Sequence, residues 1–189
     1  MGQVIQFEET AVASLRQRLG AAESANEDLV AFARGHSGAV AAIHRAVLSA
    51  IEADSVEELL NSVTVDWPKL LGLDVVTIGL VIGGQGFRAD DAGIGFLDSS
   101  LIDRALKGLD EVELRTVDRG HPLFGRAASE IRAEALIRVG QKGDGSYGLL
   151  ALGHCETGVV ETGHGAALLR FLGRSLGAML TRWSRPHLD

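Results

Sequence analysis

The chain has 189 residues, of which 46% are hydrophobic and 23% charged, and its formal net charge of -7 gives a pI near 5.4. This length suits one globular domain with an appendage, and the acidic balance argues against direct binding of nucleic acid, because that affinity comes from clustered Lys and Arg. No apolar run reaches the roughly 20 residues of a membrane-spanning helix, and residues 1–9 lack the features of a signal peptide, so we expect a cytoplasmic protein without membrane contact.

Residues 8–34 carry a stripe with the three- and four-residue spacing of a coiled-coil seam. Its members are Val12, Leu15, Leu19, Ala22, Asn26, Leu29 and Ala33. Asn26 falls at a seam position where a lone buried Asn fixes register and favours two parallel strands, so the stripe predicts a homodimer. The alternative is a hairpin within one chain, because Gly20 weakens a short segment that could fold back on the next helix.

Two helical segments follow the stripe. The first is predicted over residues 37–53, and its apolar face contains Val40, Ile43, Val47, Leu48 and Ile51. The second begins at Ser55, because Ser55 and Glu58 form a capping-box signature. Pro68 predicts a break or kink near residues 66–68, and Gly72 is expected to end the helix.

The middle of the chain reads as strands joined by tight turns. Residues 74–82 are β-branched and nearly continuously apolar, which is typical of a strand in the middle of a sheet. Glycines within 83–86 turn the chain into a shorter strand over residues 87–90. Residues 112–117 form a further predicted strand.

A helix and an irregular segment are expected around that last strand. Asp98 can cap a helix of two to three turns, which Gly108 ends. Residues 118–128 follow neither the helical nor the strand period. They are the predicted functional loop, because loops on rigid scaffolds carry binding.

The last third of the chain predicts a hairpin and a closing helix. Alternation over residues 135–139, a turn at 142–145 and an apolar run over 147–153 indicate two paired strands. From about Gly165 the spacing is helical, with an apolar face of Leu168, Leu169, Leu172, Leu176, Met179, Leu180 and Trp183. Four arginines, Arg170, Arg174, Arg182 and Arg185, are interpreted as a solvated helix face.

Motifs for cofactors and metals do not fit their required contexts. Residues 143–148 match the letters G-x-G-x-x-G, but a strand follows where a dinucleotide site needs a helix, so we expect no nucleotide cofactor. The segment 154–164 gathers His, Cys and Glu side chains without a recognised zinc spacing, so no metal is expected. Cys155 is the only cysteine, and neighbouring histidines in sequence do not supply the geometry of a thiolate-imidazole pair.

Short segments resemble a known family. Residues 26–29, 53–60, 123–125 and 148–153 resemble family 484 of the bacterial domains of unknown function, whose members look GAF-like. The resemblance implies an antiparallel sheet with helices on one face and a ligand cavity on the other. This family often has Ser where this chain has Glu134 and His154, which implies a different ligand if those serines touch one.

The expected fold is α+β. It consists of a GAF-like antiparallel sheet flanked by helices over residues 54–189, with a helical, coiled-coil-like dimerisation segment over residues 1–53. The resemblance implies a ligand pocket between the sheet and the helix of residues 98–107, closed by the loop of 118–128.

Five side chains are candidates for that pocket: Arg115, His121, Phe124, Arg126 and Arg138. Two arginines converging on one cavity would suit a carboxylate or a phosphate, because a guanidinium holds either through two parallel hydrogen bonds. Strand alternation leaves open whether Arg115 and Arg138 face the pocket or solvent. Phe124 is interpreted as a core plug that anchors the loop.

The expected function is non-catalytic: a dimeric sensory or regulatory module that binds a small ligand, anionic if the arginines converge, or a partner protein. Two alternatives remain at this point. The first is a Cys155-dependent reductase of a small sulfoxide, by analogy with GAF-like reductases of free methionine sulfoxide. The second is an interaction protein that acts beside a DNA recombinase, which rests on family association alone.

Overall fold

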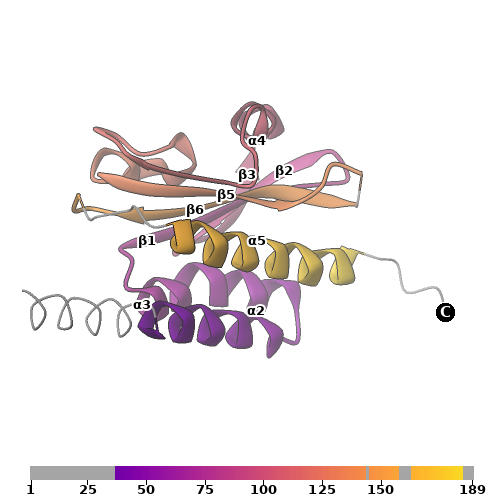
Figure 1. Ribbon diagram of the computed structural model, residues 1–189. Helices are drawn as coiled ribbons and strands as arrows, with labels where there is room; N and C mark the ends of the chain where they lie inside the picture. The colour runs from indigo at the N-terminus through magenta and orange to yellow at the C-terminus, as the bar shows by residue number, and fades with distance from the viewer. Residues whose placement is uncertain (1–36, 144, 158–162, 185–189) are drawn as a thin grey trace, which may run out of the picture. The chain divides into compact units, whose positions relative to one another are not determined.

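The computed structural model describes residues 37–143, 145–157 and 163–184 (Figure 1). The chain divides into two compact units, Met1–Val40 and Ala41–Asp189. Of the first unit, only residues 37–40 are described, and they belong to a helix that spans residues 37–51. The stripe of residues 8–34 lies outside the described residues, so its dimerisation role stays a prediction.

The second unit is built on an antiparallel sheet of six strands in the order β3-β2-β1-β6-β5-β4. The strands are β1 Val75–Ile82, β2 Gln85–Asp90, β3 Gly93–Leu97, β4 Val112–Thr116, β5 Ala133–Gly140 and β6 Ser146–His154. β1 lies in the interior of the sheet, and β5 and β6 form a hairpin, as their sequences predict. The expected α+β fold with an antiparallel sheet is therefore confirmed.

β3 is the strand that the sequence did not reveal. Two of its five residues, Gly93 and Gly95, are glycines, and four of the five are exposed, so it lacks the apolar alternation of a half-buried strand. It forms because β2 offers a free edge, against which Gly93 pairs with Asp90 and Leu97 pairs with Gly86.

Helices cover both faces of the sheet. One face carries α2 Val56–Asn61, the π-helix η1 Ser62–Asp66, α3 Trp67–Leu71 and α5 Gly163–Ser184. The other face carries α4 Ser99–Leu106 and the 3-10 helix η2 Pro122–Ser129. Figure 1 shows α4 and α5 on opposite sides of the sheet. The loop predicted over residues 118–128 is thus partly helical.

The first core lies between the sheet and the helices on the face that carries α5, and residues 41–51 also contribute to it. Ile43, Ala46, Val47 and Ala50 are buried in this core, and the indole Nε1 of Trp67 donates a 2.9 Å hydrogen bond to the Ala46 carbonyl oxygen. The compact unit therefore includes residues that the sequence analysis assigned to the N-terminal segment.

The apolar face predicted for residues 37–53 is narrower than expected. Leu48 is 55% exposed and Ile51 is 59% exposed, because Ala46 and Ala50 take the buried positions instead. On α5, Leu172, Leu176 and Leu180 are buried, whereas Trp183 is 40% exposed. Helical spacing identified the two helices, but only the packing shows which side of each stripe faces the core.

Local signals at α2, η1 and α3 are realised as predicted. The Ser55 hydroxyl oxygen accepts a 3.1 Å hydrogen bond from the Glu58 N–H, and the Glu58 carboxylate accepts one of 2.9 Å from the Asp54 N–H. Such a cap contributes about 1 kcal/mol. The break before Pro68 is the π-helix, and Gly72 ends α3 with a left-handed φ of 67°.

A second apolar core fills the space between the sheet and α4 with η2. Ile102 and Leu106 of α4 and Leu123 and Phe124 of η2 are buried there against sheet residues. A Cβ atom on Gly79 of β1 would lie 2.9 Å from the Leu123 Cδ1 atom, so these layers are in close contact. The space in which the resemblance placed a ligand pocket is thus occupied by aliphatic and aromatic side chains.

Candidate functional site

Two pockets lie where the sheet loses a strand partner. β2 pairs with β1 only from Ile78 onward, so residues 75–77 of β1 have no neighbour on that side. The cavity beside this part of β1 has a volume of about 900 Å³, and a separate cavity beside β5 has a volume of about 570 Å³. On the other side of the sheet, β4 begins only at its pair with Ile137 and the Glu111 carbonyl oxygen accepts from the Arg138 N–H, so residues 139–140 of β5 have no strand neighbour there.

The larger cavity, here called the β1 pocket, lies beside the start of β1, between the β2–β3 hairpin and η2. Its polar and aromatic lining includes Thr77, Arg88, Asp90, Phe124, Arg126 and Glu130. Its volume lies within the range of small-molecule sites, which is roughly 300–1,000 Å³.

Thr77 is the most informative residue of the β1 pocket. It is fully buried, and its hydroxyl oxygen has no hydrogen-bond partner within the described part of the chain. Val76 and Ile78 face the first core, so alternation turns Thr77 toward the side of η2, where it pairs with Ala151 of β6. A buried hydroxyl without a partner costs about 1–3 kcal/mol, so a group that completes its hydrogen bond gains that much.

Arg88 is held rigidly in the wall of the β1 pocket. Its Nη2 atom lies 2.5 Å from the Asp90 carboxylate, and its Nε–H donates a 2.7 Å hydrogen bond to the Leu123 carbonyl oxygen. Gly125 passes directly over the guanidinium with φ 58°, and a Cβ there would lie 2.7 Å from Nη2. Glycine is therefore required at residue 125 both by conformation and by space.

The charges of the β1 pocket are mostly negative. Its lining contains the carboxylates of Asp74, Asp90, Asp91 and Glu130 and the guanidinium groups of Arg88 and Arg126. Since Arg88 is paired with Asp90, the remaining balance favours a neutral or cationic ligand over an anion.

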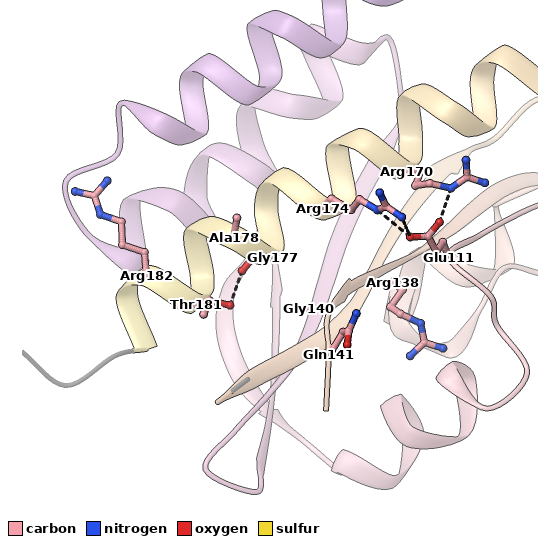
Figure 2. Close-up of a pocket in the computed structure, with 10 residues that line it drawn as sticks. All are labelled: Glu111, Arg138, Gly140, Gln141, Arg170, Arg174, Gly177, Ala178, Thr181 and Arg182. Atoms are coloured by element: carbon pink, nitrogen blue, oxygen red, sulfur yellow. Dashed lines mark hydrogen bonds and ion pairs between the residues drawn. The ribbon is translucent and has the colours of Figure 1, made fainter. Parts of the chain in front are cut away.

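The smaller cavity, here called the α5 pocket, lies where α5 crosses the open edge of β5 (Figure 2). Its charged lining is Glu111, Arg138, Arg170, Arg174 and Arg182. Arg138 donates from Nη2 to the carbonyl oxygens of Leu106 and Leu109 and from Nε to that of Asp110. Arg138 thus holds the segment that joins α4 to β4.

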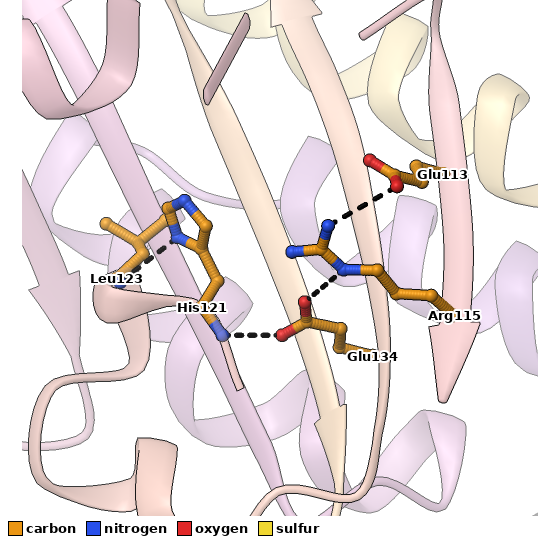
Figure 3. Close-up of polar contacts among 5 residues, drawn as sticks. All are labelled: Glu113, Arg115, His121, Leu123 and Glu134. Carbon is orange, nitrogen blue, oxygen red and sulfur yellow. Dashed lines mark hydrogen bonds and ion pairs between the residues drawn. The ribbon is translucent and has the colours of Figure 1, made fainter. Parts of the chain in front are cut away.

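Arg115 and His121 belong to a third arrangement, centred on Glu134 of β5 (Figure 3). The Glu134 side chain is fully buried, and it accepts hydrogen bonds of 2.6 Å from Arg115 Nε and from the His121 backbone N–H. The His121 Nδ1 atom accepts a 3.1 Å hydrogen bond from the Leu123 N–H. Burial holds the pKa of His121 below its usual value, so this imidazole is neutral near pH 7.

The five predicted side chains therefore do not converge on one cavity. Phe124 and Arg126 line the β1 pocket, Arg138 lines the α5 pocket, and Arg115 and His121 line neither. Phe124 is buried in the second core, in agreement with a core plug. A role in ligand binding for these five residues stays a prediction.

Sequence reasoning missed Thr77 and Arg88 in the β1 pocket and Arg170 and Arg174 in the α5 pocket. Thr77 left a signal, because it interrupts an otherwise apolar strand. Arg170 and Arg174 also left one, since a spacing of four places them on one helix face. Arg88 left none, because β2 is short and polar.

Cys155 lies beside Asp74 at the end of β6. The Asp74 carboxylate accepts hydrogen bonds from the Cys155 backbone N–H, at 2.7 Å, and from His154 Nδ1. The Cys155 N–H is the main reason that the pKa of Asp74 lies below its usual value. Burial, followed by the negative charge of Asp74, raises the pKa of the Cys155 thiol, which disfavours the thiolate that a nucleophile requires.

Among the described residues, no group of three or more His, Cys, Asp and Glu side chains is placed to hold a metal ion. Glu161, which belongs to the segment considered for a metal in the sequence analysis, lies outside the described residues. None of the described helices combines the length and the apolar character needed to cross a bilayer.

The sheet order and the helices on its two faces define a GAF-like fold. The GAF domain of a two-component sensor histidine kinase from Bacillus halodurans aligns with a TM-score of 0.51 at 16% identity, over 69% of this chain and 96% of that chain. The structure of JSC1_58120g3 in its far-red absorbing dark state, with bound biliverdin IXa, aligns with a TM-score of 0.52 at 15% identity. The alignment covers 76% of this chain and 99% of that chain. At these identities the likeness concerns the fold alone.

The chromophore-binding domain of the Stigmatella aurantiaca bacteriophytochrome is also similar, with 18% identity over 74% of this chain and a TM-score of 0.48. This chain spans 58% of that chain. Among curated proteins, none matches this sequence. The chain belongs to the family described as "Protein of unknown function, DUF484", which matches residues 1–185 and confirms the resemblance to family 484.

Proposed function

We propose that this chain is a non-catalytic regulatory module of GAF-like fold that binds a small, neutral or cationic molecule in the β1 pocket. The observation that carries the proposal is the Thr77 hydroxyl, which is buried at the wall of a cavity of about 900 Å³ without a partner among the described residues. A protein gains nothing from such a group in the empty state, whereas a ligand that completes its hydrogen bond gains affinity and orientation.

The rigid surroundings of Thr77 support this function. Arg88 is fixed by Asp90 and by the Leu123 carbonyl oxygen, and Phe124 is buried at the same wall. Side chains held in this way preserve the shape of a site before the ligand arrives, which lowers the entropic cost of binding. The acidic lining adds a preference against small anions.

A non-catalytic role is also the simpler reading of Cys155. Its thiol has a raised pKa beside Asp74, which works against the reductase alternative. The dimer predicted from residues 8–34 would join two such modules. A role beside a DNA recombinase finds no support in the residues described.

The test uses the full chain and a thermal-shift screen of neutral and cationic metabolite-sized compounds. A true ligand is expected to raise the melting temperature of the wild type and to raise that of Thr77→Val much less. Thr181→Val is the matched control, because the Thr181 hydroxyl already donates a 2.9 Å hydrogen bond to the Gly177 carbonyl oxygen and Thr181 does not line the β1 pocket. Compounds that stabilise Thr77→Val as much as the wild type would contradict binding at this pocket.

A further inference from the structure

The α5 pocket has a local excess of positive charge. Its lining holds four guanidinium groups, those of Arg138, Arg170, Arg174 and Arg182, and one carboxylate, that of Glu111. The whole chain is acidic, with a net charge of -7, so this local excess opposes the overall balance. A concave surface with concentrated positive charge raises the local concentration of anions.

Two of these arginines, Arg170 and Arg174, already contact the Glu111 carboxylate of the same chain. Arg174 donates from Nε and Nη2 to one Glu111 oxygen at 2.9 and 2.6 Å, and Arg170 Nε lies 2.5 Å from the other oxygen. Figure 2 shows both side chains projecting from successive turns of α5 toward this carboxylate. Arg174 directs two donors to a single oxygen, and the Arg170 contact is a close ion pair and not a hydrogen bond. Guanidinium groups placed beside both oxygens of a carboxylate can also pair with the oxygens of a phosphate.

The ion pair between Arg174 and Glu111 is accessible to anions from solution. The Arg174 side chain is 70% exposed, and the Glu111 side chain is about one third exposed. Exposed ion pairs of this kind are worth little, because water and salt compete with them. An anion from solution with a higher charge than a carboxylate can therefore compete with Glu111 for Arg170 and Arg174.

The rest of the pocket supports an external anion without competing for it. Arg138 keeps its charge at the wall while its Nε and Nη2 atoms are engaged with carbonyl oxygens. Thr181 donates its hydroxyl to the Gly177 carbonyl oxygen, and the Gln141 side chain is exposed at the rim. In Figure 2 the Arg182 guanidinium points away from Glu111, so we assign it no contact.

We propose that the α5 pocket binds a small phosphate-bearing anion, with Glu111 as an internal competitor that occupies Arg170 and Arg174 in its absence. Phosphate is favoured over carboxylate because a phosphate group carries close to two negative charges at neutral pH, and so attracts both arginines at once. The cavity of about 570 Å³ has room for more than one phosphate group. This site shares no residue with the β1 pocket and does not depend on the function proposed there.

The experiment is a calorimetric titration of the full chain with pyrophosphate at constant ionic strength. Wild type is expected to bind one pyrophosphate per chain, and Arg170→Gln with Arg174→Gln is expected to weaken binding by about tenfold or more. The matched control, Arg45→Gln with Arg119→Gln, removes the same charge from exposed arginines outside the pocket lining and should stay within roughly twofold of the wild type.

The direction in which Glu111→Gln changes the affinity for pyrophosphate decides whether Glu111 is a competitor. An internal competitor predicts that pyrophosphate binds roughly two- to fivefold tighter to this variant, which is the range that an exposed ion pair is worth. This substitution keeps every arginine, so it decides the matter even if the double arginine variant does not fold. Weaker binding by Glu111→Gln, equal binding by the arginine variant, or no binding by the wild type would each overturn the proposal. Citrate binding as tight as that of pyrophosphate would overturn the choice of phosphate.

Discussion

Glu134 and Arg115 form a salt bridge between neighbouring strands in which one partner is fully buried and the other is more than a third exposed. The Glu134 carboxylate joins β5 to β4 through Arg115 Nε and to the start of η2 through the His121 N–H. Its charge is retained in the interior only because both oxygens have donors.

Glu134→Ala is expected to lower the free energy of unfolding by about 3 kcal/mol, because two hydrogen bonds to a charged group are lost and the His121 N–H is left without its acceptor. Urea unfolding followed by circular dichroism measures this change. Glu113→Gln is the matched control: Glu113 contacts the same arginine at 3.3 Å but is 47% exposed, so its loss should cost under about 1 kcal/mol. Equal effects of the two variants would show that burial of Glu134 is not the reason.

His121 is expected to make the protein less stable in mild acid. Its folded-state pKa lies below the unfolded value of about 6.5, so as the pH falls the unfolded chain takes up the proton first. The stability contributed by neutral His121 is complete above that value and is lost as the pH falls from it toward the folded pKa. Protonation also removes the acceptor for the Leu123 N–H.

The measurement is the free energy of unfolding at pH 7.5 and pH 5.5 in the wild type and in His121→Asn. Asn can accept the same hydrogen bond at the start of η2 without titrating, so the variant should lose less stability between the two pH values. His44→Asn replaces an exposed histidine and serves as the control. A wild-type pH dependence that persists unchanged in His121→Asn would rule out this assignment.

Thr77→Val is expected to stabilise the ligand-free protein by about 1 kcal/mol. Valine has nearly the same shape and the same preference for strands, and the substitution removes a buried hydroxyl that has no partner in the described residues. Thr64→Val should instead destabilise the protein, because it removes the hydroxyl bonded to the Leu60 carbonyl oxygen. Thermal unfolding of both variants provides the comparison, and a loss of stability in Thr77→Val would indicate a partner for its hydroxyl.

Gly177→Ala is expected to destabilise the protein, although alanine is the better helix former by about 1 kcal/mol. A Cβ atom at Gly177 would lie 2.7 Å from the Gly140 backbone nitrogen, so α5 would have to move away from β5. Gly38→Ala is the control, because Gly38 lies in the helix of residues 37–51 with no atom within 4 Å of such a Cβ. Denaturant unfolding should give opposite signs for the two substitutions.

Deletion of residues 1–34 is expected to convert a dimer into a soluble monomer, because the coiled-coil stripe and Asn26 lie in that segment. Light scattering of the full chain and of the deletion variant measures the change. Asn26→Leu is a second test, since it should keep the association but relax the preference for two strands. A dimer that survives the deletion would place the interface elsewhere.

The sequence by itself determined the features that depend on near neighbours along the chain. The capping box at Ser55, the break before Pro68 and the left-handed end at Gly72 each involve residues within a few positions, and the structure has all three. The hairpin of β5 and β6 follows from its turn and its apolar run. These signals were sufficient for the α+β class and for the central place of β1.

Only the tertiary structure decided where the polar groups meet. Arg115 reaches Glu134 across 19 positions, and Arg174 reaches Glu111 across 63, because the strand register and the crossing of α5 over β5 bring them together. The β1 pocket exists because β2 stops pairing with β1 at Ile78, an end point set by the whole sheet. Local propensity fixes the strands and helices, whereas register and packing between distant segments fix which side chains line a cavity and which lie in solvent.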